Sequence, residues 1–205
     1  MIVVVEGPSA AGKTTWIAEH RDGAAVVGEA PPGAAPDRGE DPAAAAAHWA
    51  EVSATRWAAA CYAEQQAGIA LCDTDPFKLH YVWCLWRTGN ATVRQWRAEM
   101  NACRQLFAGR RLGIADLILV SIPEPAVLTA RRQADLTRRR RHFDLHAQLA
   151  EPLRDWYSAV SALEPDRVRW QLPATGISGL ANLPPRIPRT GTVVFEGLMD
   201  HLPAR

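Results

Sequence analysis

Residues 7–14 carry the part of this sequence whose residue types and spacing most directly indicate chemistry. They read Gly-Pro-Ser-Ala-Ala-Gly-Lys-Thr and match the phosphate-binding pattern G-x-x-x-x-G-K-[ST] at every fixed position. In such a loop the backbone N–H groups face phosphate oxygens, the lysine reaches the β- and γ-phosphates, and the following hydroxyl can ligate Mg²⁺. Lys13 and Lys78 are the two lysines of the chain, and the other residues counted as Lys or Arg are all arginine.

The pattern predicts that ATP and magnesium bind at this loop. Lys13 is expected to act in catalysis as well as in binding, and Thr14 is expected to ligate Mg²⁺. The residues expected to contact the nucleotide are Gly7, Ser9, Ala10, Ala11, Gly12, Lys13, Thr14 and Thr15. The alternative interpretation is an ordinary glycine-rich turn between a strand and a helix.

The flanking sequence has the organisation that a phosphate-binding loop requires. Residues 1–5 form a continuous apolar and largely β-branched run, which is typical of a strand buried on both faces of a parallel sheet. Residues 15–20 suit a helix, and the beginning of that helix would add partial positive charge beside the phosphates. Strand, glycine loop and helix in this order favour the phosphate-binding interpretation.

Three acidic residues follow predicted strands at the edge where ligands of open parallel sheets bind. They are Glu29, Asp73 and Asp75. Phosphoryl transfer with magnesium needs one acidic group to support the metal and another to orient or deprotonate the attacking hydroxyl. Asp73 is the expected metal residue, and Asp75 and Glu29 are the candidates for the base. Which of the three acts as the base stays open, since Asp75 before Pro76 could also cap the next helix.

A strongly basic segment follows the fourth predicted strand. Residues 131–142 contain six arginines, which repel one another unless an anion or an acidic surface lies nearby. The position is that of a kinase lid, whose arginines close over phosphates and offset the developing charge. Arg132 and Arg138 are the expected catalytic residues of this segment. The alternatives are a solvated helix face and a nucleic-acid patch.

Predicted strands and helices alternate along most of the chain. Strands are expected at residues 1–5, 24–28, 69–72, 115–122 and 167–172, and helices at 43–67, 77–87, 92–107, 124–141 and 142–163. The second helix should begin at the cap Asp41-Pro42 and stop at Gly68. A further edge strand is expected at 191–197. The alternation favours a five-stranded parallel sheet with helices on both faces.

Composition narrows the class of protein. A length of 205 residues suits one core, and a net charge of +1 makes nucleic acid an unlikely partner and gives no argument for a membrane surface. No apolar run has the length of a membrane span, and the chain enters a predicted strand at once, so we expect neither a membrane span nor a signal peptide. Four cysteines without C-x-x-C spacing suit a reducing cytoplasm. The eight tryptophans suit either a monomer core or a possible homodimer.

Over residues 1–172 the chain resembles P-loop kinases of the nucleoside and deoxynucleoside kinase group, often labelled AAA-family ATPases. Glu29 in Val-Gly-Glu-Ala-Pro looks like the glutamate base of deoxynucleoside kinases, whereas Asp73-Thr74-Asp75 looks more like shikimate-kinase-type and ribosylnicotinamide-kinase-type enzymes. The helix at 145–157 is similar to the one after the deoxynucleoside kinase lid. The resemblance implies a nucleoside-kinase-like P-loop NTPase fold, with three α/β/α layers and an arginine-rich lid.

The expected organisation is a P-loop kinase domain at residues 1–175, with the lid at about 131–143. A C-terminal extension at 176–205 is expected to pack on the same domain.

The leading functional hypothesis is an ATP-dependent kinase that phosphorylates a hydroxyl of a small molecule, with a nucleoside-like acceptor as the first choice. An antibiotic or secondary metabolite is the alternative acceptor, because the Ala- and Arg-rich composition suggests a GC-rich genome. A nucleotide-binding ATPase or switch that acts on a protein partner is the alternative of another class. A GTPase is disfavoured, because neither lysine lies in the guanine-reading pattern N-K-x-D.

Overall fold

The computed structural model of the chain describes residues 1–29, 35–134, 143–180, 183–186 and 188–204. In chain order its elements are β1 (Ile2–Glu6), α1 (Lys13–His20), β2 (Ala25–Val27), α2 (Pro42–Ala67), β3 (Ala70–Asp73), α3 (Leu79–Arg87), α4 (Val93–Ala108), β4 (Leu117–Val120), α5 (Pro125–Ala134), α6 (Phe143–Gln148), α7 (Ala150–Leu163), β5 (Val168–Arg169), the 3-10 helix η1 (Ser178–Leu180) and α8 (Thr192–His201). Within the described part of the chain, no helix combines the length and the apolar composition needed to cross a membrane.

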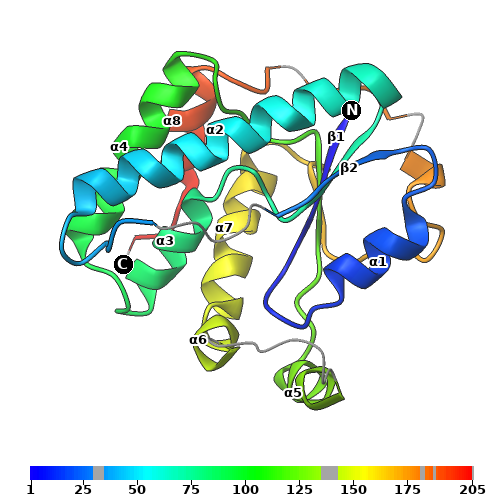
Figure 1. Cartoon of the computed structure of the whole chain (residues 1–205), viewed down its shortest axis with the longest axis horizontal. Coiled ribbons are helices and arrows are strands. Elements are labelled where there is room, and N and C mark those ends of the chain that lie inside the picture. Colours follow the sequence, from blue (N-terminus) through cyan, green and yellow to red (C-terminus); the bar gives the residue numbers. More distant parts are fainter. Residues whose placement is uncertain (30–34, 135–142, 181–182, 187, 205) are drawn as a thin grey trace.

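The five strands form one parallel sheet in the order β2-β3-β1-β4-β5 (Figure 1). The central strand is β1, in which Val3 lies opposite Leu71 of β3 and Leu117 of β4. This arrangement confirms the predicted five-stranded parallel sheet. Because the strands are parallel, their carboxyl ends share one edge, and the loops that follow them come together there.

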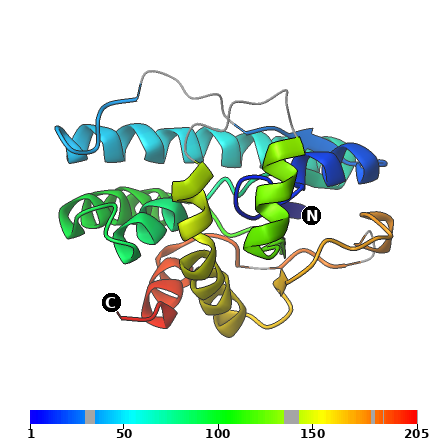
Figure 2. The ribbon, with the colours of Figure 1, turned by 90° about the horizontal axis from the view of Figure 1, so that it is seen from below.

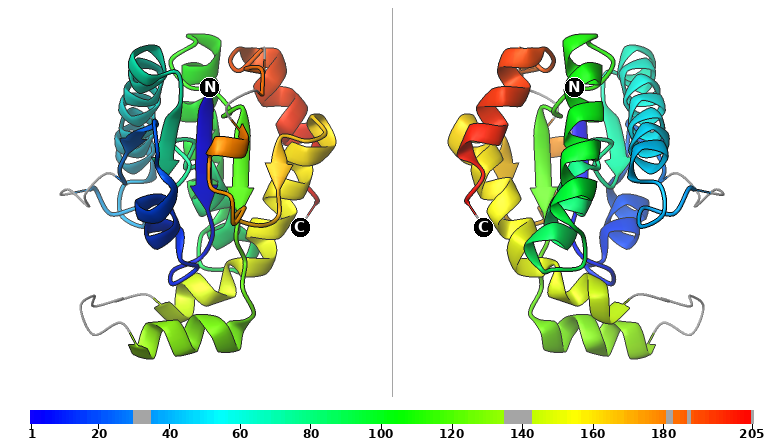
Figure 3. Two further views of the ribbon diagram at one scale, coloured as in Figure 1. Left: turned by 90° about the vertical axis from the view of Figure 1, so that its right-hand side faces the viewer. Right: turned by 90° about the vertical axis from the view of Figure 1, so that its left-hand side faces the viewer.

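Both faces of the sheet are covered, as alternate residues of β1 show. Ile2 and Val4 belong to a core built with α2, α3, α4, α7 and α8, whereas Val3 and Val5 belong to a second core with Trp16 of α1. Figure 3 shows α1 in front of the sheet from one side and α4 in front from the other. The predicted three-layer α/β/α arrangement is therefore confirmed.

The long helix α2 has a defined beginning and end. Asp41 Oδ1 accepts hydrogen bonds from the N–H groups of Ala43 (3.2 Å) and Ala44 (3.0 Å), and Pro42 occupies the first turn. The helix ends at Gly68, whose φ of 76° is readily adopted by glycine. These contacts confirm the predicted cap at Asp41-Pro42 and the stop at Gly68.

The predicted edge strand at 191–197 is wrong, because these residues begin the helix α8. Val194, Phe195 and Leu198 are buried, and their spacing places them on one face of a helix that packs against α7 and α4. The ring centroids of Phe195 and Phe107 lie 5.2 Å apart. Tertiary packing thus outweighs the strand preference of the Thr-Val-Val sequence.

Other boundaries differ from the sequence expectation. The single helix predicted at 142–163 is the pair α6 and α7, with Leu149 between them. The fifth strand is limited to Val168–Arg169 at the sheet edge, where it pairs with β4 alone. The predicted helix at 124–141 corresponds to α5 up to Ala134, and residues 135–141 lie outside the described residues.

The segment before α8 is attached to the sheet by Arg189. Its Nη1 and Nη2 donate to the two carboxylate oxygens of Glu64 at 2.7 and 2.6 Å, and its Nε donates to Asp116 Oδ1 at 2.7 Å. The Asp116 side chain is 1% exposed, and its Oδ2 accepts from the Ile2 N–H at 2.7 Å. Figure 2 looks onto the end that carries α5 and α6 and shows α8 beside α7, on the opposite side from α2.

We predict that Arg189→Met lowers the free energy of unfolding by about 3 kcal/mol, because it leaves the Asp116 carboxylate buried without its guanidinium partner. Urea denaturation would measure the change. Arg186→Met is the matched control, because the Arg186 side chain is one-third exposed and forms a 3.5 Å ion pair with Glu164. The backbone N–H of residue 186 still donates to Asp116 in this variant, so the change should cost less than about 1 kcal/mol. Equal losses in the two variants would contradict the prediction.

Candidate functional site

The loop after β1 adopts a conformation that depends on its two glycines. A Cβ atom on Gly7 would lie 2.1 Å from the backbone oxygen of Ser121, and Gly12 has a φ of 94°. Ala10 also has a positive φ, of 70°. Backbone that alternates between right- and left-handed conformations forms concave nests of N–H groups that bind anions. The structure thus places this nest at the beginning of α1, where the helix adds partial positive charge.

Two cations lie against this phosphate-binding loop. Lys13 Nζ donates to the carbonyl oxygens of Gly7 (2.8 Å) and Pro8 (3.2 Å). From α5, Arg131 Nη1 donates to the carbonyl oxygen of Ala11 at 2.8 Å. The pKa of Lys13 is lowered, mainly by burial. Lys13 and Arg131 therefore both place a positive charge against this loop.

The structure brings together the two residues predicted to support magnesium. Thr14 Oγ1, in the first turn of α1, donates to Asp73 Oδ2, at the end of β3, over 2.8 Å. An adjacent hydroxyl and carboxylate suit Mg²⁺, which binds few protein oxygens and keeps phosphate and water ligands. The residues present therefore fit a magnesium ion. In the described residues, His, Cys, Asp and Glu form no group of three that could hold a metal without a substrate.

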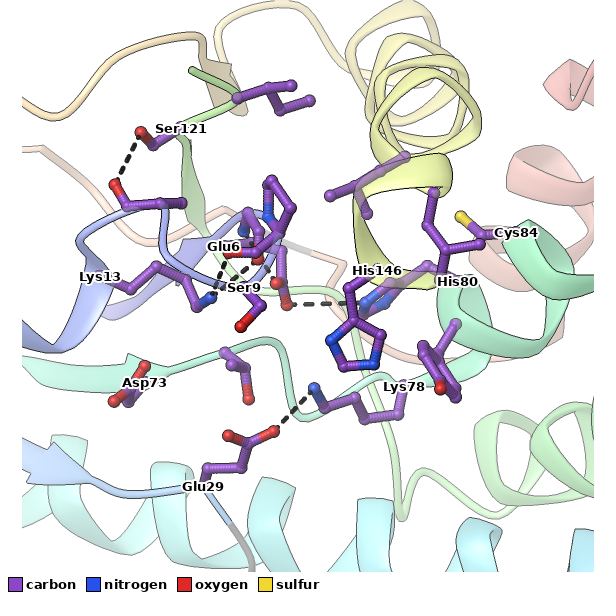
Figure 4. A pocket seen from close by; sticks show the side chains of 18 of the residues that line it. Glu6, Ser9, Lys13, Glu29, Asp73, Lys78, His80, Cys84, Ser121 and His146 are labelled. Carbon is purple, nitrogen blue, oxygen red and sulfur yellow. Dashed lines mark hydrogen bonds and ion pairs between the residues drawn. The ribbon is translucent and has the colours of Figure 1, made fainter. Parts of the chain in front are cut away.

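Glu29 faces the same cavity and is paired with a lysine. Lys78 Nζ lies 3.4 Å from Glu29 Oε1, and the Glu29 side chain is 59% exposed. Glu29 follows β2, and Lys78 lies directly before α3. Figure 4 shows this pair across the cavity from Lys13, with Asp73 nearby. A carboxylate and an ammonium group thus face the phosphate-binding loop.

Glu6, the last residue of β1, connects this loop to the segment after β3. Its Oε1 accepts from the Gly7 N–H (2.8 Å) and its Oε2 from the Asp75 N–H (2.9 Å). Burial would raise the pKa of Glu6, but neighbouring positive charge, most strongly that of Lys78, lowers it to about 2. His80 Nε2 lies 3.6 Å from Glu6 Oε2, and burial lowers the pKa of His80 to about 4. Glu6 is therefore ionised beside a neutral imidazole at neutral pH.

Arg56 of α2 holds the ends of β2 and β3. It is 5% exposed, and its guanidinium donates to the carbonyl oxygens of Asp73 (2.8 Å), Thr74 (3.0 Å), Asp75 (3.0 Å) and Gly28 (3.3 Å). Thr74 has a φ of 70°, a left-handed conformation that costs a β-branched residue about 1–3 kcal/mol. Arg56 therefore stabilises the strained turn that presents Asp73 to the cavity.

The structure does not bring Asp75 to the cavity. The residue is 2% exposed, and its carboxylate accepts hydrogen bonds from the Phe77 N–H (2.9 Å) and the Tyr157 hydroxyl (3.1 Å). Burial raises the pKa of Asp75 to about 7, against the effect of these hydrogen bonds. The contact with Phe77 closes a turn before α3, but Asp75 does not cap that helix, because the N-cap residue of α3 is Lys78 and no side chain caps it. The left-handed Thr74 turns Asp75 away from the direction of Asp73.

Of the basic segment, Arg131 faces the loop and Arg132 does not. Arg132 Nη1 pairs with Asp144 Oδ1 at 3.1 Å, and its guanidinium lies 4.6 Å from the ring centroid of Phe143. Neighbouring residues of a helix point about 100° apart, so Arg131 and Arg132 face different directions, and the catalytic role of Arg132 stays a prediction. Arg138 lies outside the described residues.

The phosphate-binding loop, Glu29 and Lys78 line one cavity of about 1680 Å³. This volume exceeds the roughly 300–1,000 Å³ of a usual ligand pocket, so it can accommodate a nucleotide and a second small molecule. The far end is lined by Trp49 and Ser53 of α2 and Tyr81 of α3. The cavity thus has a phosphate end and a second end between helices.

Sequence reasoning missed four residues of this site, and it had a signal for two of them. Lys78 is the other lysine of an arginine-rich chain, so the argument that singled out Lys13 applied to it as well. Glu6 directly precedes Gly7 at the end of a predicted strand. Arg131 was included in the basic segment but not preferred, and nothing in the alanine-rich context of Arg56 indicated its role.

Comparisons with known proteins show the fold. No protein-family model and no curated protein sequence matches the chain. The structure of deoxyadenosine kinase from M. mycoides with bound dATP matches with a TM-score of 0.52 and 13% identity, over 98% of this chain and 99% of that chain. The structure of that kinase with the products dCMP and dCDP gives 0.51 and 14%, over 98% of each chain. The chain therefore has a nucleoside-kinase-like P-loop fold.

We predict that Arg56→Lys lowers the free energy of unfolding by about 3 kcal/mol, because one ammonium group cannot reach carbonyl oxygens at the ends of two strands. Chemical denaturation would measure it. Arg94→Lys, on the exposed face of α4, is the control and should change stability by less than about 0.5 kcal/mol. An equally small effect at Arg56 would exclude a stabilising role for its contacts.

We predict that Asp75→Asn makes the protein more stable at high pH. The folded state keeps a proton on Asp75 up to about pH 7, whereas the unfolded chain releases it near the ordinary value of 3.8. The stabilising contribution is therefore complete below pH 4 and is lost between pH 4 and 7. Asparagine keeps an acceptor for the Phe77 N–H.

Unfolding at about pH 8 should therefore require on the order of 2–4 kcal/mol more for Asp75→Asn than for wild type, with a smaller difference at pH 5. Urea denaturation at both pH values would measure this. Asp155→Asn is the control, because Asp155 is over one-third exposed. A loss of stability that is equal at both pH values would rule out the explanation.

Proposed function

We propose that this protein is an ATP-dependent kinase that transfers the γ-phosphoryl group to a hydroxyl of a nucleoside-like small molecule. The observation that carries the proposal is the position of Glu29 and Lys78, which face a complete phosphate-binding loop across one cavity. A binding switch needs the loop but has no need of a carboxylate on the acceptor side. A cavity with room for two molecules supports transfer between them.

The phosphate-binding loop and the flanking cations are proposed to hold the nucleotide. The triphosphate would accept hydrogen bonds from the N–H groups of the nest, and Lys13 would exchange its carbonyl partners for the β- and γ-phosphates. Arg131 would do the same from α5. Arg132 and Arg138 remain predictions as further lid residues. This arrangement places most of the positive charge where the transferred group gains negative charge.

Thr14 and Asp73 are proposed to hold Mg²⁺. When bound there, the ion neutralises phosphate charge and orients the terminal phosphates. The hydrogen bond between the two side chains holds both oxygens close together. Arg56 supports Asp73 through the carbonyl oxygen of that residue.

Glu29 is proposed to be the general base in preference to Asp75. The acceptor hydroxyl oxygen would form a bond to the γ-phosphorus as the bond from phosphorus to the β–γ bridging oxygen breaks, and ADP leaves with that oxygen. Glu29 would take the hydroxyl proton. Lys78, whose Nζ lies 3.4 Å from Glu29 Oε1, would contribute positive charge at the acceptor side.

A nucleoside-like acceptor is supported by the far end of the cavity and by the structural neighbours. Trp49, Tyr81 and His146 provide aromatic surface there, which suits a flat ring better than a polyol. The neighbouring deoxyadenosine kinase structures contain dATP, dCMP and dCDP. An antibiotic or other secondary metabolite with a flat ring would fit the same cavity, so the acceptor panel must include such compounds.

We predict that incubation with Mg-ATP and a panel of nucleosides, nucleoside monophosphates and hydroxyl-bearing antibiotics yields a product 80 mass units heavier than its acceptor, the mass of one HPO₃ group added in phosphoryl transfer. Lys13→Met should lower kcat/KM at least about 100-fold through lost charge stabilisation. Glu29→Gln should lower kcat by about 100- to 1,000-fold with little change in the KM for ATP. Mass spectrometry and steady-state kinetics would measure both.

Glu40→Gln is the control, because Glu40 is exposed and does not line the cavity. Circular dichroism would verify that each variant is folded. ADP formation without any phosphorylated acceptor would favour the ATPase or switch instead. Normal turnover in Glu29→Gln would reject Glu29 as the base.

A further inference from the structure

A second charged pair lies in the cavity and takes no part in the proposed chemistry. Arg38, in the turn before α2, pairs with Glu99 of α4, with 2.5 Å between Arg38 Nε and Glu99 Oε1. The guanidinium carbon lies 4.9 Å from the ring centroid of Trp49 and 5.7 Å from that of Tyr81. All four residues line the cavity. The guanidinium group of Arg38 thus occupies a site formed by two aromatic rings and a carboxylate.

A group that binds at this site must donate hydrogen bonds through N–H groups. The Glu99 side chain is 7% exposed, and burial raises its pKa while the charge of Arg38 opposes the shift. A buried carboxylate without a hydrogen-bond donor is costly, whereas one that accepts charge-assisted hydrogen bonds is stable. Any molecule that takes the place of Arg38 must therefore donate hydrogen bonds to Glu99.

The distance between this site and the Glu29–Lys78 pair matches the length of a nucleoside. On α2, Arg56 contacts the end of β2, and Trp49 comes seven residues earlier, about 10 Å along the helix axis. On α3, Tyr81 follows Lys78 by three residues, about one turn. A nucleoside whose 5′-hydroxyl lies at Glu29 and Lys78 would therefore place its base near Trp49 and Tyr81.

We propose that Trp49, Tyr81 and Glu99 form a specificity subsite for a flat, amino-bearing ring of the acceptor, and that Arg38 fills this subsite until the acceptor displaces it. The proposal rests on the proposed kinase function for the identity of the acceptor as a nucleoside. The exchange replaces one donor to Glu99 by another, so it leaves no buried charge without a partner.

The exchange would discriminate between rings by their hydrogen-bonding edges. An exocyclic amine, as in cytosine or adenine, donates to Glu99 in place of Arg38. A carbonyl oxygen at the same position, as in uracil or hypoxanthine, would face the carboxylate with its lone pairs, and Arg38 would then keep its place. Discrimination by a buried polar group left without a partner is typically strong.

The test is calorimetric titration with two matched pairs of nucleosides, deoxycytidine with deoxyuridine and deoxyadenosine with deoxyinosine, at about pH 8. Wild type should bind the amino member of each pair at least about tenfold more tightly. Glu99→Gln should remove the preference. Arg38→Met should tighten binding of the amino members by about tenfold or more, because the competing guanidinium is gone.

Weaker binding of amino nucleosides by Arg38→Met would overturn the displacement, because it would mean that Arg38 contacts the ligand. Equal binding within the pairs by wild type would overturn the subsite. The double variant Arg38→Met/Glu99→Gln removes both charges, and its unfolding midpoint identifies any effect that comes from instability of the single variants.

Benzamidine and its neutral analogue benzamide separate failure of this inference from failure of the kinase assignment. Benzamidine carries a flat ring and a donating amidinium, so it should bind the subsite whether or not the acceptor is a nucleoside. Ligand-observed NMR should detect benzamidine with wild type, at least about tenfold weaker binding with Glu99→Gln, and weaker binding of benzamide. Binding of benzamidine that does not depend on Glu99 would overturn the inference, whereas absence of nucleoside phosphorylation alone would overturn only the proposed function.

Discussion

The geometry of the cavity depends on the hydrogen bonds that the buried carboxylate of Glu6 accepts. It accepts the N–H of Gly7 from the phosphate-binding loop and the N–H of Asp75 from the segment after β3, so it fixes these two loops relative to each other. The positive charges of Lys78 and Lys13 lower its pKa and keep it ionised. Both lysines of the chain are therefore electrostatic partners of one carboxylate. A compact ammonium suits this crowded position better than a guanidinium.

Three cations at this edge of the sheet donate hydrogen bonds to backbone carbonyl oxygens. Lys13 and Arg131 bind carbonyls of the phosphate-binding loop, and Arg56 binds carbonyls that follow β2 and β3. Because carbonyl groups of the loop accept hydrogen bonds from cations, N–H groups of the same loop can face a bound anion. Carbonyl oxygens are also weaker partners than phosphates, so Lys13 and Arg131 can transfer to an anion at small cost. Arg56 is buried, and its hydrogen bonds to carbonyl oxygens hold the segments after β2 and β3 together.

The sequence predicted the elements whose signals are local. The strands β1, β3 and β4 are apolar runs that must be buried on both faces, and the cap of α2 is specified by Asp41 and Pro42. The helix α8 was missed, because its β-branched first turn favours a strand and only packing on Phe107 decides otherwise. Residues at the carboxyl ends of strands, such as Asp73, could be placed at the site for the same local reason.

Residues whose role depends on tertiary contacts could not be placed in this way. Asp75 lies two positions after Asp73, yet the left-handed Thr74 between them sends the carboxylate into the core beside Tyr157. No pattern predicts this, because threonine disfavours a positive φ and is held there by Arg56 from a distant helix. The pairing of Lys78 with Glu29 joins residues 49 positions apart, which no local pattern can indicate.

The two ends of the cavity differ in charge, and this difference has a consequence for how substrates enter. Lys13 and Arg131 make the phosphate end positive, whereas Glu99 is the carboxylate that α4 contributes to the far end. In the proposed kinase, the nucleotide phosphates would be attracted to the N–H groups and the two cations of the first end. An acceptor that donates N–H groups is favoured at the far end and has no carboxylate partner within the loop. In the proposed arrangement these charges would favour the phosphates at the first end and the amino-bearing ring of the acceptor at the far end, with the acceptor hydroxyl toward Glu29. Without a bound acceptor, Arg38 is the hydrogen-bond donor to the buried Glu99 carboxylate. In the proposed exchange the acceptor would replace Arg38 as donor, so Glu99 would never be buried as an unpaired charge.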